Sequence, residues 1–144
     1  MSDPQPIEPP RIFATFRYKN AAAIIDWLVD ILGFTVHARY DGEDGTVGHA
    51  ELAFGSSMIM IGDEKQDAYG RMIGTSGETG GKSLYIVVND VDALFAKVKA
   101  SGAKIEEGLT DRDYGSREFI CRDPEGNIWC FGTYWPKAHE KPAG

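Results

Sequence analysis

The sequence predicts an α+β fold made of two copies of a βαβββ repeat. Two amphipathic helical segments of equal length begin at Asn20 and Asn89 and end at Gly33 and Gly102. One strand-like segment precedes each helix and three follow it. Neither half contains a helix pair or sheet that could bury a core alone. We therefore expect two mostly antiparallel, curved four-stranded sheets around a cavity, with the helices outside.

The first repeat is expected over residues 11–63. Its opening segment RIFATFRYK is rich in β-branched and aromatic residues, which favours a strand. Three further strands, FTVHARYD, VGHAELAF and SMIMIGD, follow the helix, and a tight turn at Gly55 and Ser56 joins the last two. The helix carries one apolar face, formed by Ile24, Leu28, Ile31 and Leu32.

The second repeat is expected over residues 82–136. KSLYIVV is its first strand, and SREFICR and NIWCFGTYW form a hairpin around DPEG. Strand alternation points Trp129 toward the helix layer, so we expect it in the core. Residues 64–81 are polar, rich in glycine and without a period, which predicts a linker loop. The remaining segments, 1–10 and 137–144, are expected to be a flexible arm and a flexible tail.

Composition and charge narrow the function. The chain has 144 residues, with 42% hydrophobic and 26% charged residues, which is typical of one globular domain. A net charge of −7 argues against nucleic acid and anionic membranes as partners. The sequence contains neither an apolar run of membrane-spanning length nor a secretory signal pattern. Cys121 and Cys130 fit no disulfide or zinc framework, so we expect reduced thiols and a cytoplasmic location.

Three segments resemble the vicinal oxygen chelate superfamily: RYKNAAAIIDWLVDILGFTV, VVNDVDALFAKVKASGAKI and YGSREFICRDPEGNIWCF. This superfamily includes glyoxalase I, extradiol dioxygenases, fosfomycin-resistance transferases and bleomycin-resistance proteins. The resemblance extends from about residue 11 to 136, and RDPEGN is its most specific motif. It implies the paired-repeat fold and is compatible with both enzymes and binding proteins. The chain looks closest to glyoxalase-like branches of uncharacterised function.

The resemblance also implies where a metal would bind. Metal-dependent relatives place His, Gln or Glu at positions that correspond here to Phe13, Met60, Ser83 and Cys130. An open divalent site needs about three nitrogen or oxygen ligands, which these residues do not supply. We therefore expect no metal and no cofactor. A soft Cys and Met site for Cu(I) and a displaced site built on His49 and Glu51 are the alternatives.

Strand pairing predicts which side chains share a face. A hairpin turning at Gly55 and Ser56 places Ala53 opposite Met58 and Glu51 opposite Met60. His49 and Glu51 then share the face of Met60. A hairpin around DPEG places Arg117 and Cys121 on the face of Cys130, and Tyr85 shares a face with Ser83. The predicted ligand site therefore has walls of Phe13, Met58, Met60 and Cys130, and polar groups from His49, Glu51, Tyr85 and Arg117.

Two functions follow from this site. The first is a metal-free protein that binds and sequesters a small cationic or aromatic ligand, as the resemblance to resistance proteins implies. Relatives of this size pair their chains, so a homodimer is expected. The alternative is a lyase-, isomerase- or dioxygenase-like enzyme that uses a shifted metal site or Glu51 as general base. A structural pairing of Glu51 with Arg117 would instead give neither residue a ligand role.

Overall fold

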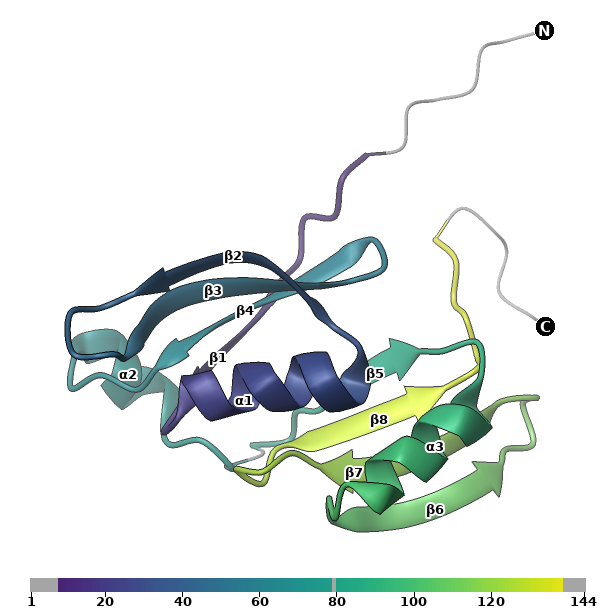
Figure 1. The fold of residues 1–144 in the computed structure, drawn as a ribbon. Coiled ribbons are helices and arrows are strands. Elements are labelled where there is room, and N and C mark those ends of the chain that lie inside the picture. The colour runs from purple at the N-terminus through teal and green to yellow at the C-terminus, as the bar shows by residue number, and fades with distance from the viewer. Residues whose placement is uncertain (1–7, 79, 139–144) are drawn as a thin grey trace, which may run out of the picture. The chain divides into compact units, whose positions relative to one another are not determined.

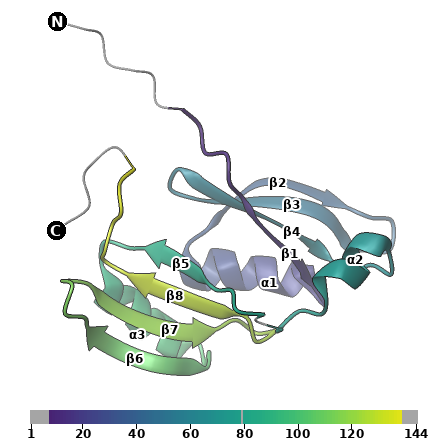
Figure 2. The ribbon, with the colours of Figure 1, turned by 180° about the vertical axis from the view of Figure 1, so that it is seen from behind.

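The computed structural model describes residues 8–78 and 80–138. Over these residues it contains two four-stranded sheets and few helices in two βαβββ units, which confirms the predicted fold class (Figures 1 and 2). The chain divides into two compact units between Gln66 and Asp67. The predicted arm (1–10) and tail (137–144) lie largely outside the described residues. No helix in the described ranges has both the length and the apolar character needed to cross a bilayer.

The first unit has a sheet with strand order β1-β4-β3-β2, in which only the β1–β4 pair is parallel. The first helix contacts β1 and β4 and covers one face of this sheet (Figure 1). The elements in chain order are β1 (Ala14–Tyr18), α1 (Ala21–Trp27), the π-helical turn η1 (Leu28–Leu32), β2 (Thr35–Asp41), β3 (Val47–Phe54) and β4 (Ser57–Asp63).

Local polar groups fix the ends of the first helix. The Asn20 side chain accepts a hydrogen bond from the backbone three residues on, at 3.1 Å, as an N-cap should. The Asp63 carboxylate at the end of β4 accepts from the amides of Ala21 (2.9 Å) and Val47 (2.6 Å). One side chain therefore ties the helix start to two strands. The helix ends at Gly33, whose φ of +84° favours glycine.

The second unit has the strand order β5-β8-β7-β6, again with one parallel pair, β5–β8. Helix α3 contacts β6 and β7, and both views place it on one face of the sheet (Figures 1 and 2). The elements in chain order are α2 (Ala68–Ile73), β5 (Leu84–Val87), α3 (Val91–Ala100), β6 (Ile105–Asp111), β7 (Arg117–Arg122) and β8 (Ile128–Gly132).

Aromatic residues fill the space between α3 and its sheet. Trp129, Phe119 and Phe131 have no exposed surface, and the Phe119 and Phe131 rings stack with centroids 5.1 Å apart. The Trp129 indole donates to the Asp123 carboxylate at 3.0 Å, which satisfies the only polar atom of this buried side chain. The predicted core position of Trp129 is confirmed.

The two hairpins differ in how well their registers were predicted. The β3–β4 register is confirmed, with Ala53 opposite Met58 and Glu51 opposite Met60. The β7–β8 register is wrong by one residue, because Cys121 lies opposite Trp129 and not on the face of Cys130. The Asp123 amide bonds the Asn127 carbonyl at 2.9 Å, so the loop has an odd length, 124–126. A loop of three residues shifts the pairing by one position relative to the four-residue DPEG loop. The side chains of β7 therefore lie on the opposite face from the predicted one.

The segment predicted as a linker loop, 64–81, contains regular structure. Helix α2 lies within it, and the Asp67 side chain caps that helix by accepting from the Gly70 amide at 2.7 Å. Gly74 ends α2 with a φ of +82°. One of the glycines that made this segment look irregular, Gly74, thus ends a short helix.

Candidate functional site

In the second unit, the face of the sheet opposite α3 carries polar side chains. Strand pairing places Tyr85 beside Cys130, Cys130 beside Ile120, and Gly132 beside Glu118. Side chains alternate along each strand, so these residues lie opposite the buried Trp129 and Phe131 side chains. Among the described residues of this unit, α3 packs on the other face, which leaves this one as the candidate ligand surface.

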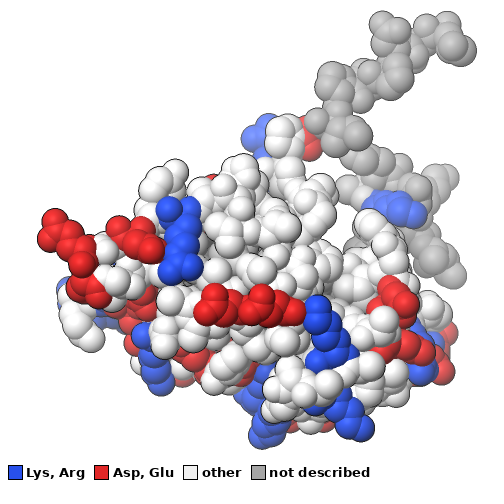
Figure 3. All heavy atoms as spheres, in the orientation of Figure 1, with Lys and Arg blue, Asp and Glu red and all other residues white. Residues whose placement is uncertain are grey.

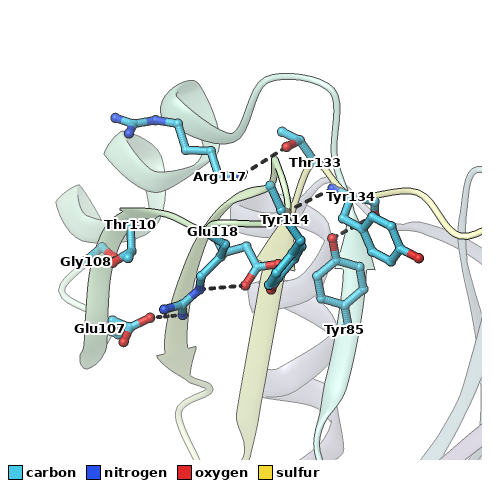
Figure 4. A network of polar contacts seen from close by, with 11 residues as sticks. Tyr85, Glu107, Gly108, Thr110, Tyr114, Arg117, Glu118, Thr133 and Tyr134 are labelled. Carbon is cyan, nitrogen blue, oxygen red and sulfur yellow. Dashed lines mark hydrogen bonds and ion pairs between the residues drawn. The ribbon is translucent and has the colours of Figure 1, made fainter. Parts of the chain in front are cut away.

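Glu118 is the centre of this surface (Figure 4). Its carboxylate accepts from the Arg112 Nε at 3.0 Å and from the Tyr114 hydroxyl at 2.8 Å. Arg112 also pairs with Glu107 of β6. The Glu118 side chain is only 12% exposed, which is low for a carboxylate. The β6–β7 turn therefore supplies the partners that allow β7 to keep a charge on a half-buried face.

Tyr85 crosses β8 where that strand has no side chain. Its hydroxyl donates to the Tyr134 carbonyl at 2.7 Å (Figure 4). A Cβ atom added at Gly132 would lie 2.7 Å from the Tyr85 hydroxyl and 2.7 Å from the Glu118 Cγ. Glycine at 132 thus gives both side chains room on this face.

Hydrogen bonds control the ionisation of the cluster. Burial acts to raise the pKa of Glu118, but hydrogen bonds from Tyr114, Arg112 and Ser116 together outweigh it and hold the pKa below its usual value. The bond to Glu118 raises the pKa of Tyr114. Burial raises the pKa of Tyr85. At neutral pH the surface therefore carries an ionised Glu118 and two protonated phenols.

Cys130 lies on this face as a half-buried thiol. Burial raises its pKa, a hydrogen bond with Ser83 opposes that rise, and the charges of Glu118 and Glu107 add to it. A thiol that keeps its proton is a small apolar group and a poor metal ligand. Ser83, the position implied as a ligand in metal-dependent relatives, is thus paired with Cys130.

In the first unit, the face opposite α1 carries a second polar group. The His49 Nε2 lies 2.9 Å from the Glu51 Oε2, and the His37 Nε2 lies 4.0 Å from the other carboxylate oxygen. The ring of Tyr40 stacks on His49 with centroids 6.2 Å apart. Glu51 is 28% exposed and pairs across strands with Met60. His49, Glu51 and Met60 thus share a face, as the tight turn predicted.

The other predicted residues of the first unit are Met58 and Phe13. Met58 is partly exposed on the same face of β4, two residues before Met60. Phe13 is partly exposed and precedes β1 directly. No three His, Cys, Asp or Glu side chains in the described part of the chain are placed to hold one metal ion. The two fallback metal ligands, His49 and Glu51, instead form a hydrogen-bonded pair.

Arg117 was predicted on the face of Cys130, but it lies on the opposite face of the sheet. Its Nε donates to Asp92 of α3 at 2.7 Å and its Nη1 to Asp111 at 3.0 Å. It points away from Glu118 in Figure 4. The one-residue change of register puts Glu118 on the face that had been assigned to Arg117.

Sequence reasoning missed Glu118 and its partners Arg112, Tyr114 and Glu107. The signal was present as the charged and aromatic run DRDYGSRE at 111–118, which combines a turn with ion-pairing groups. Interpreting it required the correct register of β7, because the face that Glu118 occupies decides whether these nearby side chains form a cluster with it.

Comparisons with known proteins agree with this architecture. The family profile described as the Glyoxalase/Bleomycin resistance protein/Dioxygenase superfamily matches residues 12–131. An uncharacterised protein of Mycobacterium bovis is 30% identical over 115 residues, which cover 78% of this chain and 76% of the relative. The crystal structure of TioX from Micromonospora superposes with a TM-score of 0.66 at 29% identity, over 85% of this chain and 94% of TioX.

A further solved structure, TnmS3, is an antibiotic-binding protein from Streptomyces. It matches with a TM-score of 0.62 at 18% identity, over 87% of this chain and 97% of its own. The repeat, the sheet order and the profile match together define the class: a paired βαβββ protein. The chain belongs to the Glyoxalase/Bleomycin resistance protein/Dioxygenase superfamily.

Proposed function

We propose that this protein is a metal-free binder of a small organic molecule, and that the ligand lies on the sheet face of the second unit opposite α3. The observation that supports the proposal is the Glu118 cluster, which consists of Glu118, Arg112, Tyr114 and Glu107. A half-buried carboxylate with its hydrogen bonds satisfied lies beside the apolar Cys130 and Ile120 side chains. Binding sites combine apolar walls with a few fixed polar groups in this way.

The ligand class follows from charge and aromatic exposure. Glu118 and Glu107 outnumber Arg112, so the cluster carries one excess negative charge. Tyr85, Tyr114 and Tyr134 are 39%, 57% and 44% exposed, and the Tyr114 and Tyr134 rings meet edge to face at 5.9 Å. Aromatic faces beside negative charge favour a cationic or aromatic ligand.

The relatives support a binding role. The superfamily name includes bleomycin-resistance proteins, and TnmS3, which shares the fold, is an antibiotic-binding protein. We infer from these that this chain also sequesters a small molecule.

The test uses three probes in calorimetric titrations of the full chain: proflavine, which is cationic and aromatic; naphthalene sulfonate, which is anionic and aromatic; and tetramethylammonium, which is cationic only. We expect proflavine to bind most tightly. Tyr85→Ala should weaken proflavine binding about fivefold, since one lost aromatic contact is worth about 1 kcal/mol.

Arg117→Ala is the matched control, because Arg117 lies on the other face and should leave proflavine binding unchanged. The proposal fails if none of the probes binds at millimolar concentration, or if Tyr85→Ala and Arg117→Ala give the same affinity as the parent chain.

The metal-free part of the proposal has its own measurement. Protein purified without chelator should carry well under one equivalent of zinc, nickel, iron or manganese in elemental analysis, because the positions that bind metal in relatives are Phe13, Met60, Ser83 and Cys130 here. Near-stoichiometric metal would contradict this and would direct attention to His49 and Glu51.

A second candidate function rests on the hydrogen bond between His49 and Glu51. An imidazole oriented by a carboxylate is a typical general base, and proton abstraction by this pair would serve an isomerase or lyase. If Glu51 serves a ligand or substrate, Glu51→Gln should weaken binding by about 1.5–3 kcal/mol, the scale of a hydrogen bond to a charged group. Met60→Leu, which keeps volume on the same face, should do far less.

The same pair of variants separates a structural role from a functional one. If Glu51→Gln lowers the free energy of unfolding in urea, Glu51 serves the fold. A binding loss at unchanged stability assigns it to the ligand.

A further inference from the structure

The glycine-rich end of the predicted linker is attached to the turn between β7 and β8. The Asn127 Oδ1 accepts a hydrogen bond from the Gly77 amide at 3.1 Å. The Asn127 Nδ2 donates to the Ser76 hydroxyl at 3.3 Å. One amide side chain thus contacts two consecutive residues that lie about fifty positions earlier in the sequence. Figures 1 and 2 both show the segment before β5 running beside this turn.

Asn127 is also hydrogen-bonded to a buried residue of the second unit. Its Nδ2 lies 3.2 Å from the Asp123 carboxylate, and its backbone amide donates to the same group at 3.0 Å. Asp123 is only 4% exposed and also accepts from the Trp129 indole. The amide that binds the linker is therefore oriented by a buried carboxylate and, through it, by the core of the second unit.

Gly77 fits this contact for two independent reasons. Its φ is +94°, a conformation that side chains with a Cβ rarely adopt. A Cβ added there would also lie 2.6 Å from the Glu125 carbonyl oxygen, which is too close for any side chain. Backbone conformation and close approach thus both require glycine at 77.

We propose that Asn127 and Gly77 form a latch that fastens residues 75–78 to the second unit. The part of the chain able to bend between the two units is then confined to residues that precede the latch at 75–78, instead of extending over the whole segment 64–81. On the other side, the Glu64 amide donates to the Tyr18 carbonyl of β1 at 2.9 Å, which attaches the chain to the first unit.

Hydrogen–deuterium exchange of the full chain, followed by mass spectrometry, tests the latch. Asn127→Ala should accelerate exchange of the amides of 75–78 at least about tenfold, which corresponds to about 1.4 kcal/mol of lost local stability. Gly77→Ala should give the same acceleration, although it leaves every hydrogen bond within the β7–β8 turn in place. The matched control is Gly81→Ala, because Gly81 has a similar φ of +80° but open space at its Cβ position.

The two variants together make the outcome decisive. Faster exchange at 75–78 in both variants, with β7 and β8 still protected and Gly81→Ala like the parent chain, supports the latch. Unchanged exchange at 75–78 in Gly77→Ala overturns it, whatever Asn127→Ala does, because loss of Asn127 also removes a bond to Asp123. Equal acceleration in Gly81→Ala overturns it as well, since general strain in the segment would then explain the effect.

Discussion

Glu118 stays ionised on a surface that exposes only 12% of its side chain. Its hydrogen bonds lower its pKa despite burial, so the folded state binds the proton less tightly than the unfolded chain does. Its contribution to stability is therefore complete above the ordinary value of 4.5 and is lost as the pH falls through the lower folded value.

Glu118→Gln should show this dependence. At pH 7 we expect the free energy of unfolding to fall by about 1.5–3 kcal/mol, the scale of hydrogen bonds to a charged group. The difference between the parent chain and the variant should shrink below pH 4.5, where the unfolded carboxyl takes up a proton. Urea denaturation at pH 7 and at pH 4 measures it. A difference that grows on acidification would contradict the assigned charge state.

The two cysteines should differ in reactivity. Burial raises the pKa of Cys121 to about 12, and it also raises that of Cys130, which is only half buried. Thiolates are the reactive form, so both should alkylate at least about tenfold more slowly in the folded protein than in urea. Iodoacetamide labelling at pH 7.5, read by peptide mass, should modify Cys130 first. Labelling of Cys121 before Cys130 would mean that β7 opens before iodoacetamide reaches the half-buried Cys130 thiol.

Gly132 is expected to tolerate no larger residue. In Gly132→Ala the new methyl group would meet both the Tyr85 hydroxyl and the Glu118 side chain. Overpacking of this kind costs about 1–3 kcal/mol, and urea denaturation should detect it. Gly108→Ala is the control, because its nearest neighbour is a Phe95 ring atom at 4.0 Å. Equal stabilities of the two variants would argue against the crossing of Tyr85 over β8.

At the scale of elements, both main helices begin with a side chain that caps the helix N-terminus. The Asp90 side chain accepts from the Ala93 amide at 3.0 Å, as Asn20 does in the first unit. Asp90→Ala should lower the free energy of unfolding by about 1 kcal/mol, the usual cost of a lost N-cap. Asp90→Asn should be nearly neutral, because asparagine caps equally well. Thermal denaturation of the two variants separates capping from the effect of charge.

At the scale of the whole molecule, the net charge of −7 is not gathered in one place on the visible face. Figure 3 shows acidic and basic side chains interspersed among uncharged ones. On this face the charges do not form one acidic patch of the kind that captures a polyvalent cation. The selectivity we propose for the ligand therefore depends on the local Glu118 cluster rather than on the field of the entire chain.

Homodimer formation is the prediction at this scale. Each sheet ends in edge strands, β1 and β2 or β5 and β6, and the exposed edge strand β2 carries Tyr40 at 64% exposure. Exposed strands with apolar side chains tend to pair with another chain. Light scattering at micromolar concentration should give twice the chain mass of 15.8 kDa. A mass equal to one chain would count against the dimer.

The sequence by itself determined the repeat, the helix ends and one hairpin. Asparagine or aspartate caps and glycine stops are local signals. The second helix is capped by Asp90, one residue after the predicted start at Asn89. The β3–β4 register was also predictable, because a two-residue turn at Gly55 and Ser56 leaves one pairing. The faces of His49, Glu51 and Met60 followed from that register.

Only the tertiary structure decided the second hairpin and the site around it. The DPEGN segment can form a hairpin loop with an even or an odd number of residues. The buried hydrogen bond between Asp123 and Trp129 occurs together with the odd-numbered loop. That choice places Glu118 on the face predicted for Arg117. Glu118 can lie there because Arg112 and Tyr114, six and four residues earlier in the chain, donate hydrogen bonds to it. A largely buried charge needs such partners, and the sequence alone did not identify this one because the register of β7 decides which face it occupies.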